Sequence, residues 1–493
     1  MAAVASSSTF VHLTLYLILL CLLVFTHCGI SVQQSNRDVD DDDDHYHSLL
    51  LTSFLLPSST CNKLPSTGRP GTATTMDLTH KYGPCSKQGP SPSAPAQILT
   101  QDQHRVDWLH SKLAVTIDVD KRDRRQKKRP RLSDSAVTVP ARDGSLVSAG
   151  NFIVTVGLGT PPKPLNLIFD TGSDVTWTQC KPCAKFCHKQ SDPIFDPAES
   201  STYANVSCER AVCQRYGDVP GVSRGCSSST CLYGIQYGDQ SFSVGFLAKE
   251  KISIGNDSFD EFYFGCGQNN QGLFGGSAGL LGLGRDQFSF VSQTASKYGN
   301  FFSYCLPSTP SNVGKLTFGK GGYSKRVKFT PFAIKPQIPS FYFLDVIGVS
   351  IGGKKLSIPA SLFSTAGTLI DSGTVISRLP PTAYGAIKTE FRKQMSKYKL
   401  TTALSILDTC YDFGNLTTVS VPKVSFVFKG NVELAVAPVG VLYGSSKNQI
   451  CLAMAANGDD GDVGILGNTQ QMTQDVVYDV AGGKLGFGTA GCR

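Results

Sequence analysis

One short motif occurs twice in the chain and constrains its fold more than any other feature. Residues 167–173 read Leu-Ile-Phe-Asp-Thr-Gly-Ser and residues 368–374 read Thr-Leu-Ile-Asp-Ser-Gly-Thr, which places Asp170 and Asp371 201 positions apart. Each copy is an apolar strand that leads into an Asp and then a Gly, where the backbone can turn sharply. The repeat predicts two similar lobes, each of which delivers one carboxylate to a shared site.

A second short element repeats in the same order. Leu280-Leu281-Gly282 follows the first motif and Ile465-Leu466-Gly467 follows the second. Elsewhere short β-branched and aromatic runs alternate with Gly, Pro, Asn and Ser, which is typical of strands joined by turns. Residues 152–162 indicate a strand and a turn, and residues 384–397 are the best helix candidate of the second half. We therefore predict a mainly β, bilobal protein with a cleft between the lobes, whose boundary lies near residues 325–340.

Two carboxylates held close together cannot both ionise easily, because each negative charge disfavours the other. One member keeps its proton while the other is ionised, so the pair can act as an acid and a base at once. Such a pair can activate water against a peptide bond without a metal or a covalent intermediate. The hydroxyls that follow each Asp can hold its carboxylate in a fixed plane: Thr171, Ser173, Ser372 and Thr374.

The N-terminal region and the cysteines point to the secretory route. Residues 13–25 form a 13-residue apolar run, too short to span a bilayer comfortably, and its position predicts a signal peptide over residues 1–30. A buried strand or helix is the alternative, because no Lys or Arg precedes the run. Twelve of the sixteen cysteines follow residue 150, which indicates six disulfides. Three sequons fit N-glycosylation: Asn205, Asn256 and Asn415.

Cys180-x-x-Cys183 has the spacing of a zinc half-site, but the only imidazole nearby is that of His188. We therefore expect no metal and no other cofactor.

Residues 31–145 differ in composition from the rest of the chain. An acidic cluster at residues 38–44 is followed by a Ser/Pro/Thr-rich stretch over residues 57–97 and by a predicted helix over residues 98–113. That helix places Ile98, Val106 and Leu109 on one face. We predict that residues 31–145 are a removable propeptide, followed by an N-terminal lobe at 146–332 and a C-terminal lobe at 333–493.

Residues 121–131 hold eight basic residues against one acidic residue and allow three interpretations. A nucleic-acid patch would need aromatic or groove-reading partners, and none surround the run. A processing linker would suit its place directly before the globular part. In the third interpretation its cations pair with the two Asp carboxylates in the precursor.

Over residues 150–493 the chain resembles the pepsin-like aspartic proteases. It is most similar to their plant nepenthesin-like, atypical branch, which includes proteins named as chloroplast-nucleoid DNA-binding protease-like. The resemblance rests on both Asp motifs, on Trp177, on Tyr237-Gly238-Asp239-Gln240-Ser241 and on the Cys-rich insert between Trp177 and Tyr237. It implies a pepsin-like bilobal fold with the active site in the cleft.

The resemblance also implies a role for each matching residue. Asp170 and Asp371 would hold the lytic water, and Tyr237 would lie on a flap, with Gly238 and Asp239, and face Trp177. Thr171 and Ser372 would interlock beneath the pair, Ser173 and Thr374 would bond the outer carboxylate oxygens, and Gly172 and Gly373 would form the turns. The family pattern suggests six disulfides: Cys180–Cys183, Cys187–Cys266, Cys208–Cys231, Cys213–Cys226, Cys305–Cys492 and Cys410–Cys451.

The function implied is a secreted, monomeric aspartic endopeptidase, made as a zymogen and most active at acidic pH. Its partners would be its own propeptide and peptide or protein substrates bound in an extended form. One alternative is a catalytically silent binding protein, such as the plant xylanase inhibitors, and another is a DNA-binding protease. The apoplast is the expected location, with the vacuole or a plastid as alternatives.

Overall fold

The fold is taken from a computed structural model. It describes residues 45–55, 59–63, 73–87, 95–123, 152–237, 241–272, 274–489 and 491–492, with side chains of the 95–123 segment as far as Leu113. The predicted signal peptide, the acidic cluster, residues 124–131 of the basic run, and Gly238 and Asp239 lie outside the described residues.

A 16-stranded sheet dominates the first half of the chain and also takes in strands from the C-terminal end. Fourteen of its strands follow one another in this order: β15 (Lys328–Pro331), β31 (Lys484–Gly488), β30 (Asp475–Asp479), β13 (Phe301–Cys305), β14 (Val313–Phe318), β2 (Thr74–His80), β3 (Phe152–Leu158), β4 (Lys163–Asp170), β12 (Gly279–Gly282), β5 (Trp177–Gln179), β11 (Asp257–Gln271), β10 (Phe242–Ile254), β9 (Thr230–Gln236) and β8 (Val222–Ser227). β6 (Phe186–Cys187) pairs with β11, and β7 (Ala204–Asn205) pairs with β10.

The second half forms smaller sheets. The five-stranded sheet has the order β16 (Phe343–Leu344), β19 (Thr368–Ile370), β29 (Gly464–Leu466), β20 (Ser377–Leu379) and β28 (Met454–Ala456). One four-stranded sheet contains β18 (Lys354–Lys355), β17 (Val346–Ile351), β24 (Val424–Phe428) and β25 (Val432–Ala435). The other contains β21 (Lys399–Thr401), β22 (Cys410–Asp412), β27 (Gln449–Leu452) and β26 (Leu442–Ser446).

The repeated sequence elements pair with one another in each half. β4 and β12 run parallel with Asp170 opposite Gly282, and β19 and β29 run parallel with Ile370 opposite Leu466. The residues of both Asp-bearing strands nearest the Asp are buried, which explains their continuous apolar sequences. The two Asp residues therefore leave equivalent strand ends, as the internal repeat predicts.

Helices are short apart from two. The predicted helix at 384–397 is α8 (Pro381–Gln394), which begins earlier because Pro381 suits a first helical turn. The predicted helix at 98–113 is part of α3 (Pro95–Asp123). The shorter helices are α2 (Leu51–Leu55), α4 (Ala211–Gly217), α5 (Phe290–Gln293), α6 (Ala295–Tyr298), α7 (Ser361–Ala366), α9 (Pro438–Val441) and α10 (Asn468–Gln471), with a 3-10 turn at Pro197–Glu199.

The region predicted to be a propeptide is built into the sheets. β1 (Tyr46–Leu50) pairs with β23 (Thr418–Pro422), and β2 lies between β14 and β3. A disulfide that the sequence analysis did not anticipate, Cys61–Cys85, closes the loop around β2. Loss of β2 would separate β14 from β3 unless another segment took over its backbone hydrogen bonds.

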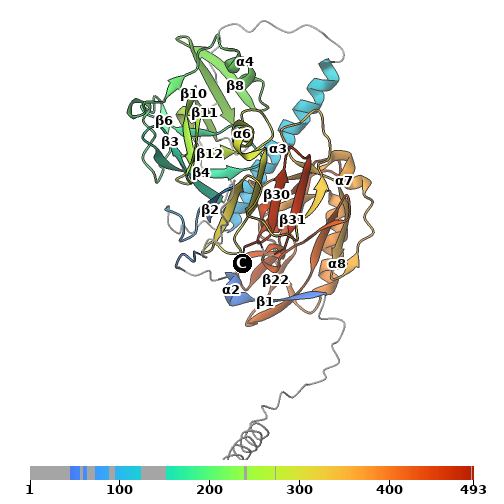
Figure 1. Cartoon of the computed structure of the whole chain (residues 1–493). Coiled ribbons are helices and arrows are strands. Elements are labelled where there is room, and N and C mark those ends of the chain that lie inside the picture. Colours follow the sequence, from blue (N-terminus) through green and yellow to red (C-terminus); the bar gives the residue numbers. More distant parts are fainter. Residues whose placement is uncertain are drawn as a thin grey trace, which may run out of the picture. The chain divides into compact units, whose positions relative to one another are not determined.

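α3 packs its apolar face against the second half of the chain. Val106 and Leu109, which were predicted to share one helix face, are both buried beside Leu369 of β19 and Ile465 of β29. Ile98 is only half-buried, because the neighbouring Leu99 takes the fully buried position. In Figure 1 α3, in cyan, runs between the green strands of the first half and the red and orange strands of the second.

Two of the expected disulfides are present in the structure, Cys305–Cys492 and Cys410–Cys451. The other four expected pairs, Cys180–Cys183, Cys187–Cys266, Cys208–Cys231 and Cys213–Cys226, are wrong. The structure has instead Cys180–Cys266, Cys183–Cys187, Cys208–Cys226 and Cys213–Cys231.

Strand register explains these corrections. β5 runs parallel to β11 with Thr178 opposite Cys266, and the Cα of Cys180, two residues further on, lies 5.4 Å from that of Cys266. Cys183 is then left to pair locally. In the β8–β9 hairpin Cys226 and Cys231 lie directly opposite one another. Cys208 and Cys213 pair with these two neighbouring cysteines, and sequence spacing cannot decide which one each takes.

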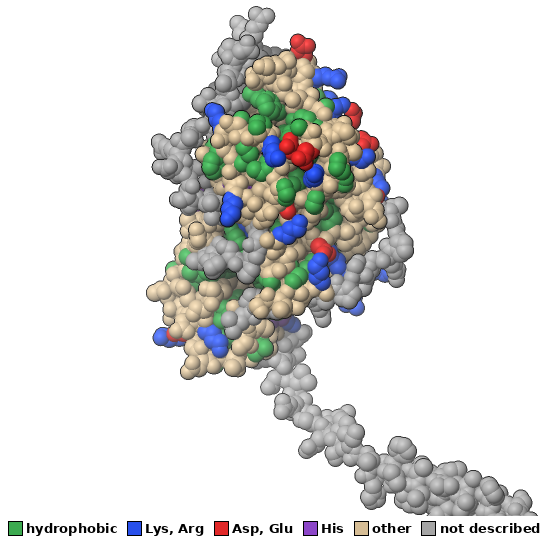
Figure 2. Space-filling view, turned by 90° about the vertical axis from the view of Figure 1, so that its left-hand side faces the viewer, with side chains coloured by type: hydrophobic (Ala, Val, Ile, Leu, Met, Phe, Trp, Pro, Cys, Tyr) green, Lys and Arg blue, Asp and Glu red, His purple; other side chains and the backbone are tan. Residues whose placement is uncertain are grey.

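The surface gives no sign of a nucleic-acid site on the face that Figure 2 shows. Lys and Arg side chains are scattered there among hydrophobic and acidic side chains. The described residues on this face thus lack the continuous basic stripe that is typical of nucleic-acid binding. Within the described ranges, no helix is long and apolar enough to cross a membrane.

Candidate active site

The two carboxylates of the repeated motif are held in the same way. Asp170 is the last residue of β4, Asp371 follows β19 directly, and both are buried. The Gly172 N–H donates to Asp170 Oδ1 at 3.0 Å, and the Ser173 hydroxyl donates to Asp170 Oδ2 at 2.7 Å. In the second copy the Gly373 N–H and the Thr374 hydroxyl bond Asp371 in the same pattern, at 3.0 and 2.5 Å. Each carboxylate is therefore fixed in a plane by its own turn.

The residue after each Asp ties the two turns together. The Ser372 N–H donates to Thr171 Oγ1 at 2.9 Å, and the Thr171 N–H donates to Ser372 Oγ at 3.1 Å. Both glycines are needed for the close approach: a Cβ on Gly172 would lie 2.6 Å from Asp371 Oδ1, and one on Gly373 would lie 2.6 Å from Asp170 Oδ1. Every supporting residue named in the two motifs thus contributes to one compact unit.

An arginine from α3 occupies the space between the two carboxylates. Arg105 Nη2 donates to Asp170 Oδ1 at 2.6 Å and to Asp371 Oδ1 at 2.9 Å, and Arg105 Nε donates to Asp371 Oδ2 at 2.9 Å. Burial opposes charge on Asp371, but Arg105, with the bonds from Thr374 and Gly373, outweighs it and lowers the pKa of Asp371. Burial also opposes charge on Arg105, yet both carboxylates raise the pKa of Arg105 further above its usual value. The site is therefore a buried ion cluster in which one guanidinium bridges two carboxylates.

A second charged residue of α3 lies one helical turn away. Asp102 accepts hydrogen bonds from the N–H groups of Val375 and Ile376, at 2.5 and 3.0 Å, and pairs with Arg378 Nη2 at 3.0 Å. The side chains of Asp102 and Arg378 are almost completely buried. Burial raises the pKa of Asp102, although Arg378 and the two N–H groups favour its charged form.

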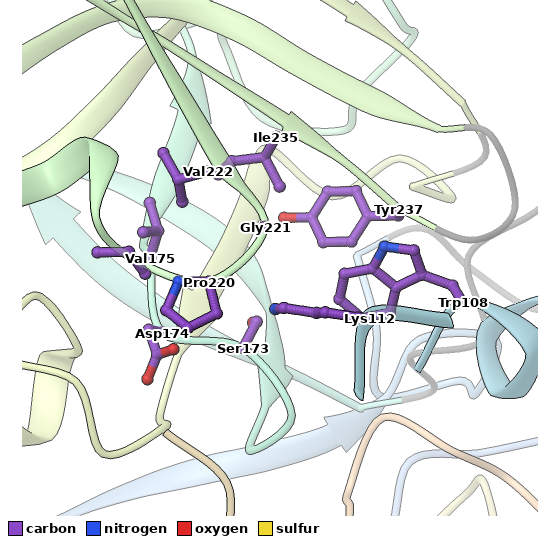
Figure 3. A pocket seen from close by; sticks show the side chains of 11 residues that line it. Trp108, Lys112, Ser173, Asp174, Val175, Pro220, Gly221, Val222, Ile235 and Tyr237 are labelled. Carbon is purple, nitrogen blue, oxygen red and sulfur yellow. The ribbon is translucent and has the colours of Figure 1, made fainter. Parts of the chain in front are cut away.

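Two further side chains of α3 fill a pocket beside Tyr237. Figure 3 shows Trp108 next to the Tyr237 ring and Lys112 extending from α3 toward Ser173. The Trp108 and Tyr237 ring centroids are 5.9 Å apart, and Trp177 Nε1–H donates to the Tyr237 hydroxyl at 2.8 Å. The cavity that remains has a volume of about 20 Å³, which leaves room for little more than one water.

Burial shapes the charges around this pocket. It lowers the pKa of Lys112 to about 8, although Asp174 and Asp170 favour the ammonium form. It raises the pKa of Asp174 to about 6, against the Asp286 N–H and Lys112, which favour the carboxylate. Lys112 Nζ also lies 4.6 Å from the Trp108 ring centroid. The same Nζ lies 5.2 Å from the ring centroid of Phe341, so a cation–π contact joins α3 to the second half of the chain.

Comparisons with known proteins agree with this geometry. The family models described as xylanase inhibitor N-terminal and xylanase inhibitor C-terminal match residues 152–320 and 341–489. The chain is 49% identical to the aspartyl protease family protein At5g10770 of Arabidopsis thaliana, over 97% of this chain and 98% of that protein. The chain belongs to the plant pepsin-like aspartic protease family.

Other relatives of this aspartic protease family agree. Aspartic proteinase nepenthesin-2 of Nepenthes gracilis is 34% identical over 73% of this chain and 81% of its own length. The solved structure of edgp aligns with a TM-score of 0.57 at 22% identity, over 70% of this chain and 93% of that one. This likeness establishes the pepsin-like fold with two lobes.

Arg105 is the site residue that sequence reasoning missed. The third interpretation of residues 121–131 anticipated a cation on the Asp pair but placed it in the basic run. The pairing cation of the described structure comes from α3 instead. A signal was present, because Asp102 and Arg105 occur at the spacing of the buried Leu99, Val106 and Leu109, where charged residues need partners.

The remaining predicted residues fall as follows. The side chains of Asn205, Asn256 and Asn415 are exposed, as glycosylation would require, and their use stays a prediction. His188 Nε2–H donates to the Ser277 carbonyl oxygen at 2.9 Å, and Cys180 and Cys183 are in disulfides. Among the described residues, no group of three or more His, Cys, Asp or Glu side chains is arranged to hold a metal ion.

Proposed function

We propose that this chain is the precursor of a secreted aspartic endopeptidase and that α3 holds its cleft shut. The observation that carries the proposal is the pair Asp170 and Asp371. Each is fixed by a Gly N–H and a hydroxyl, and both lie within hydrogen-bond reach of one nitrogen of Arg105. A position that close to both carboxylates is where a water molecule could be polarised by both.

Withdrawal of α3 would leave the two carboxylates to share one proton, because the guanidinium would no longer offset the repulsion between their charges. The ionised member would take a proton from the water as that water attacks the peptide carbonyl. The protonated member would donate to the carbonyl oxygen, and the resulting neutral gem-diol would collapse as the amine leaves. Activity should peak at acidic pH, where the pair holds one proton.

The pocket beside Tyr237 supports a preference for a bulky apolar side chain near the scissile bond. Trp108 fills that pocket in the precursor, and its ring packs against Tyr237. A substrate side chain of similar size would bury a comparable apolar surface after α3 has left. The seven disulfides of the described residues support a secretory destination.

The test is acid proteolysis by the purified full chain. We expect the wild type to process itself and to cleave a denatured protein at acidic pH, with inhibition by pepstatin. Asp170→Asn and Asp371→Asn should fold, as judged by near-ultraviolet circular dichroism, and should not cleave. Retained pepstatin-sensitive cleavage in either variant would overturn the assignment.

The same assay distinguishes an active protease from the alternative, a catalytically silent binding protein. The matching family models are described as those of a xylanase inhibitor, so inhibition of a xylanase by the chain is the corresponding measurement. A chain that inhibits xylanase and cleaves nothing at any pH would favour the silent binding protein. We favour the enzyme, because both Asp residues and all four flanking hydroxyls are present and bonded.

A further inference from the structure

Arg378 is a buried cation whose carboxylate partner is supplied by α3. Its Nη1 donates to the Ile376 carbonyl at 2.7 Å, and its Nη2 pairs with Asp102 at 3.0 Å and reaches Gln103 Oε1 at 3.3 Å. Its Nε is buried and has no hydrogen-bond acceptor among the described residues. The acidic partner found for it there is Asp102.

The Asp102 carboxylate lies in a receptor made by the enzyme part of the chain. Two consecutive N–H groups, of Val375 and Ile376, donate to its two oxygens, and Arg378 pairs with Oδ2. Val375 directly follows Thr374, whose hydroxyl bonds Asp371. Three donors therefore converge on one anion beside the candidate catalytic pair.

This receptor loses its anion when α3 leaves the cleft. A buried guanidinium and two N–H groups without acceptors are costly, so water or a ligand must replace the carboxylate. A substrate reaches the receptor because it takes the place of α3. Three residues of helix separate Asp102 from Arg105 by about 4.5 Å along the axis, and an extended peptide advances about 3.3 Å per residue. The receptor thus lies one or two substrate residues from the scissile bond.

Building on the proposed function, we propose that the mature cleft contains a carboxylate-binding subsite. It consists of Arg378 and the N–H groups of Val375 and Ile376, and it selects peptides with an ionised carboxylate one or two residues from the cleaved bond. The carboxylate comes either from an Asp or Glu side chain or from the C-terminus of a short peptide. The subsite is specificity-determining and takes no part in the bond cleavage itself.

The experiment measures kcat/KM for matched peptides after acid activation of the full chain. Each peptide carries Glu or Gln at one position on either side of the cleaved bond, and a further pair ends in a free carboxylate or an amide. At pH 5.5 we expect about a tenfold or greater preference for the charged member at one position, the scale of a hydrogen-bonded charge. The preference should change between pH 5.5 and pH 3, because a Glu side chain changes its charge near pH 4.3 and a Gln side chain does not.

Other titratable groups near the receptor are Arg105 and Asp102 on α3, the pair Asp170 and Asp371, and Tyr443, whose pKa is raised by burial and by Asp102. The protonation of the Asp pair affects both members of a matched peptide pair alike and cancels in their ratio. Both α3 residues leave with the helix, and Tyr443 stays neutral across this pH range. The change in preference therefore reports the substrate carboxylate. The Glu and Gln pairs test a side-chain source, and the carboxylate and amide pair tests a terminal one.

Arg378→Gln should abolish the preference, measured within that variant as the ratio of kcat/KM for the charged and the uncharged member of each peptide pair. Arg392→Gln is the matched control, because it removes one positive charge at an exposed position of α8. If Arg378→Gln does not fold, the peptide preference is measured instead in Arg378→Lys and, as a function of pH, in the wild type.

Three outcomes are decisive. A wild type that cleaves peptides without any preference for the charged member overturns the subsite and leaves the endopeptidase standing. A preference that survives in Arg378→Gln overturns the role of Arg378. A wild type that cleaves no peptide at all refutes the proposed function instead.

Discussion

Arg105→Met is the perturbation that most directly tests how the site is kept closed. Arg105 makes three hydrogen bonds to two buried carboxylates. Removal of one partner of a buried ion cluster costs about 3–5 kcal/mol, because the charges left behind are uncompensated. The low end applies here, since the two carboxylates can share a proton once the guanidinium is gone. A loss of about 3 kcal/mol raises the open fraction of the precursor roughly a hundredfold.

The pKa shifts of two Asp residues, one that contacts α3 and one that lies on it, predict how acid changes the stability of the closed state. The pKa of Asp371 is lowered in the closed precursor, so its contact with Arg105 stabilises that state above the ordinary pKa of 3.8. This contribution is lost as the pH falls through the lowered value. The pKa of Asp102 is raised, so acid favours that carboxyl in its buried position and works against opening. Under the proposed zymogen function, the contact between Arg105 and Asp371 is therefore the acid-sensitive contact that keeps α3 in place.

The assay is binding of immobilised pepstatin by unprocessed full chain at pH 6, with Asp107→Asn as the control because that side chain is exposed on the same helix. We expect Arg105→Met to bind under conditions where the wild type and the control do not. We also expect it to process at a higher pH. If Arg105→Met remained as closed as wild type and processed at the same pH, another contact would keep α3 in place.

Two further predictions concern the turn and the disulfides. Gly373→Ala would place a Cβ 2.2 Å from Arg105 Nη2 and 2.6 Å from Asp170 Oδ1, so we expect this variant to lose cleavage. Gly385→Ala in α8 is the control, because open space surrounds that position, and it should retain full cleavage and raise the thermal midpoint slightly. Equal activities of the two variants would contradict the packing argument. Non-reducing peptide mapping should recover Cys183 linked to Cys187 and Cys180 linked to Cys266, and a Cys180–Cys183 fragment would refute the strand register.

The Asp pair and its supports could be predicted because the signal is local and doubled. The hydroxyls and glycines lie within three residues of each Asp, and the family resemblance supplied the contact between Trp177 and Tyr237. Arg105 could not be placed in this way, because 266 residues separate it from Asp371. No rule of spacing predicts a contact between residues so far apart in the chain. The sequence pattern of α3 does indicate that two charged residues share its apolar face.

β2 is a strand that the composition of its surroundings did not indicate. Its sequence Thr-Thr-Met-Asp-Leu-Thr-His alternates polar residues with the buried Met76 and Leu78, which is the pattern of a half-buried strand. The Ser/Pro/Thr-rich surroundings indicated an irregular segment instead. The strand exists because β14 and β3 supply backbone partners from far along the chain. Tertiary pairing therefore decides the structure of a segment whose own preference is weak.

The charges on α3 also fix the direction in which that helix lies in the cleft. Asp102 and Arg105 are three residues apart and therefore share one helix face. Arg105 meets two carboxylates, and Asp102 meets Arg378 and two N–H groups. Reversal of the helix would bring Asp102 toward the carboxylates and Arg105 toward Arg378, so that both contacts would become repulsive. The cleft thus has an acidic centre and a basic flank, and any peptide that replaces α3 meets the same order of charge.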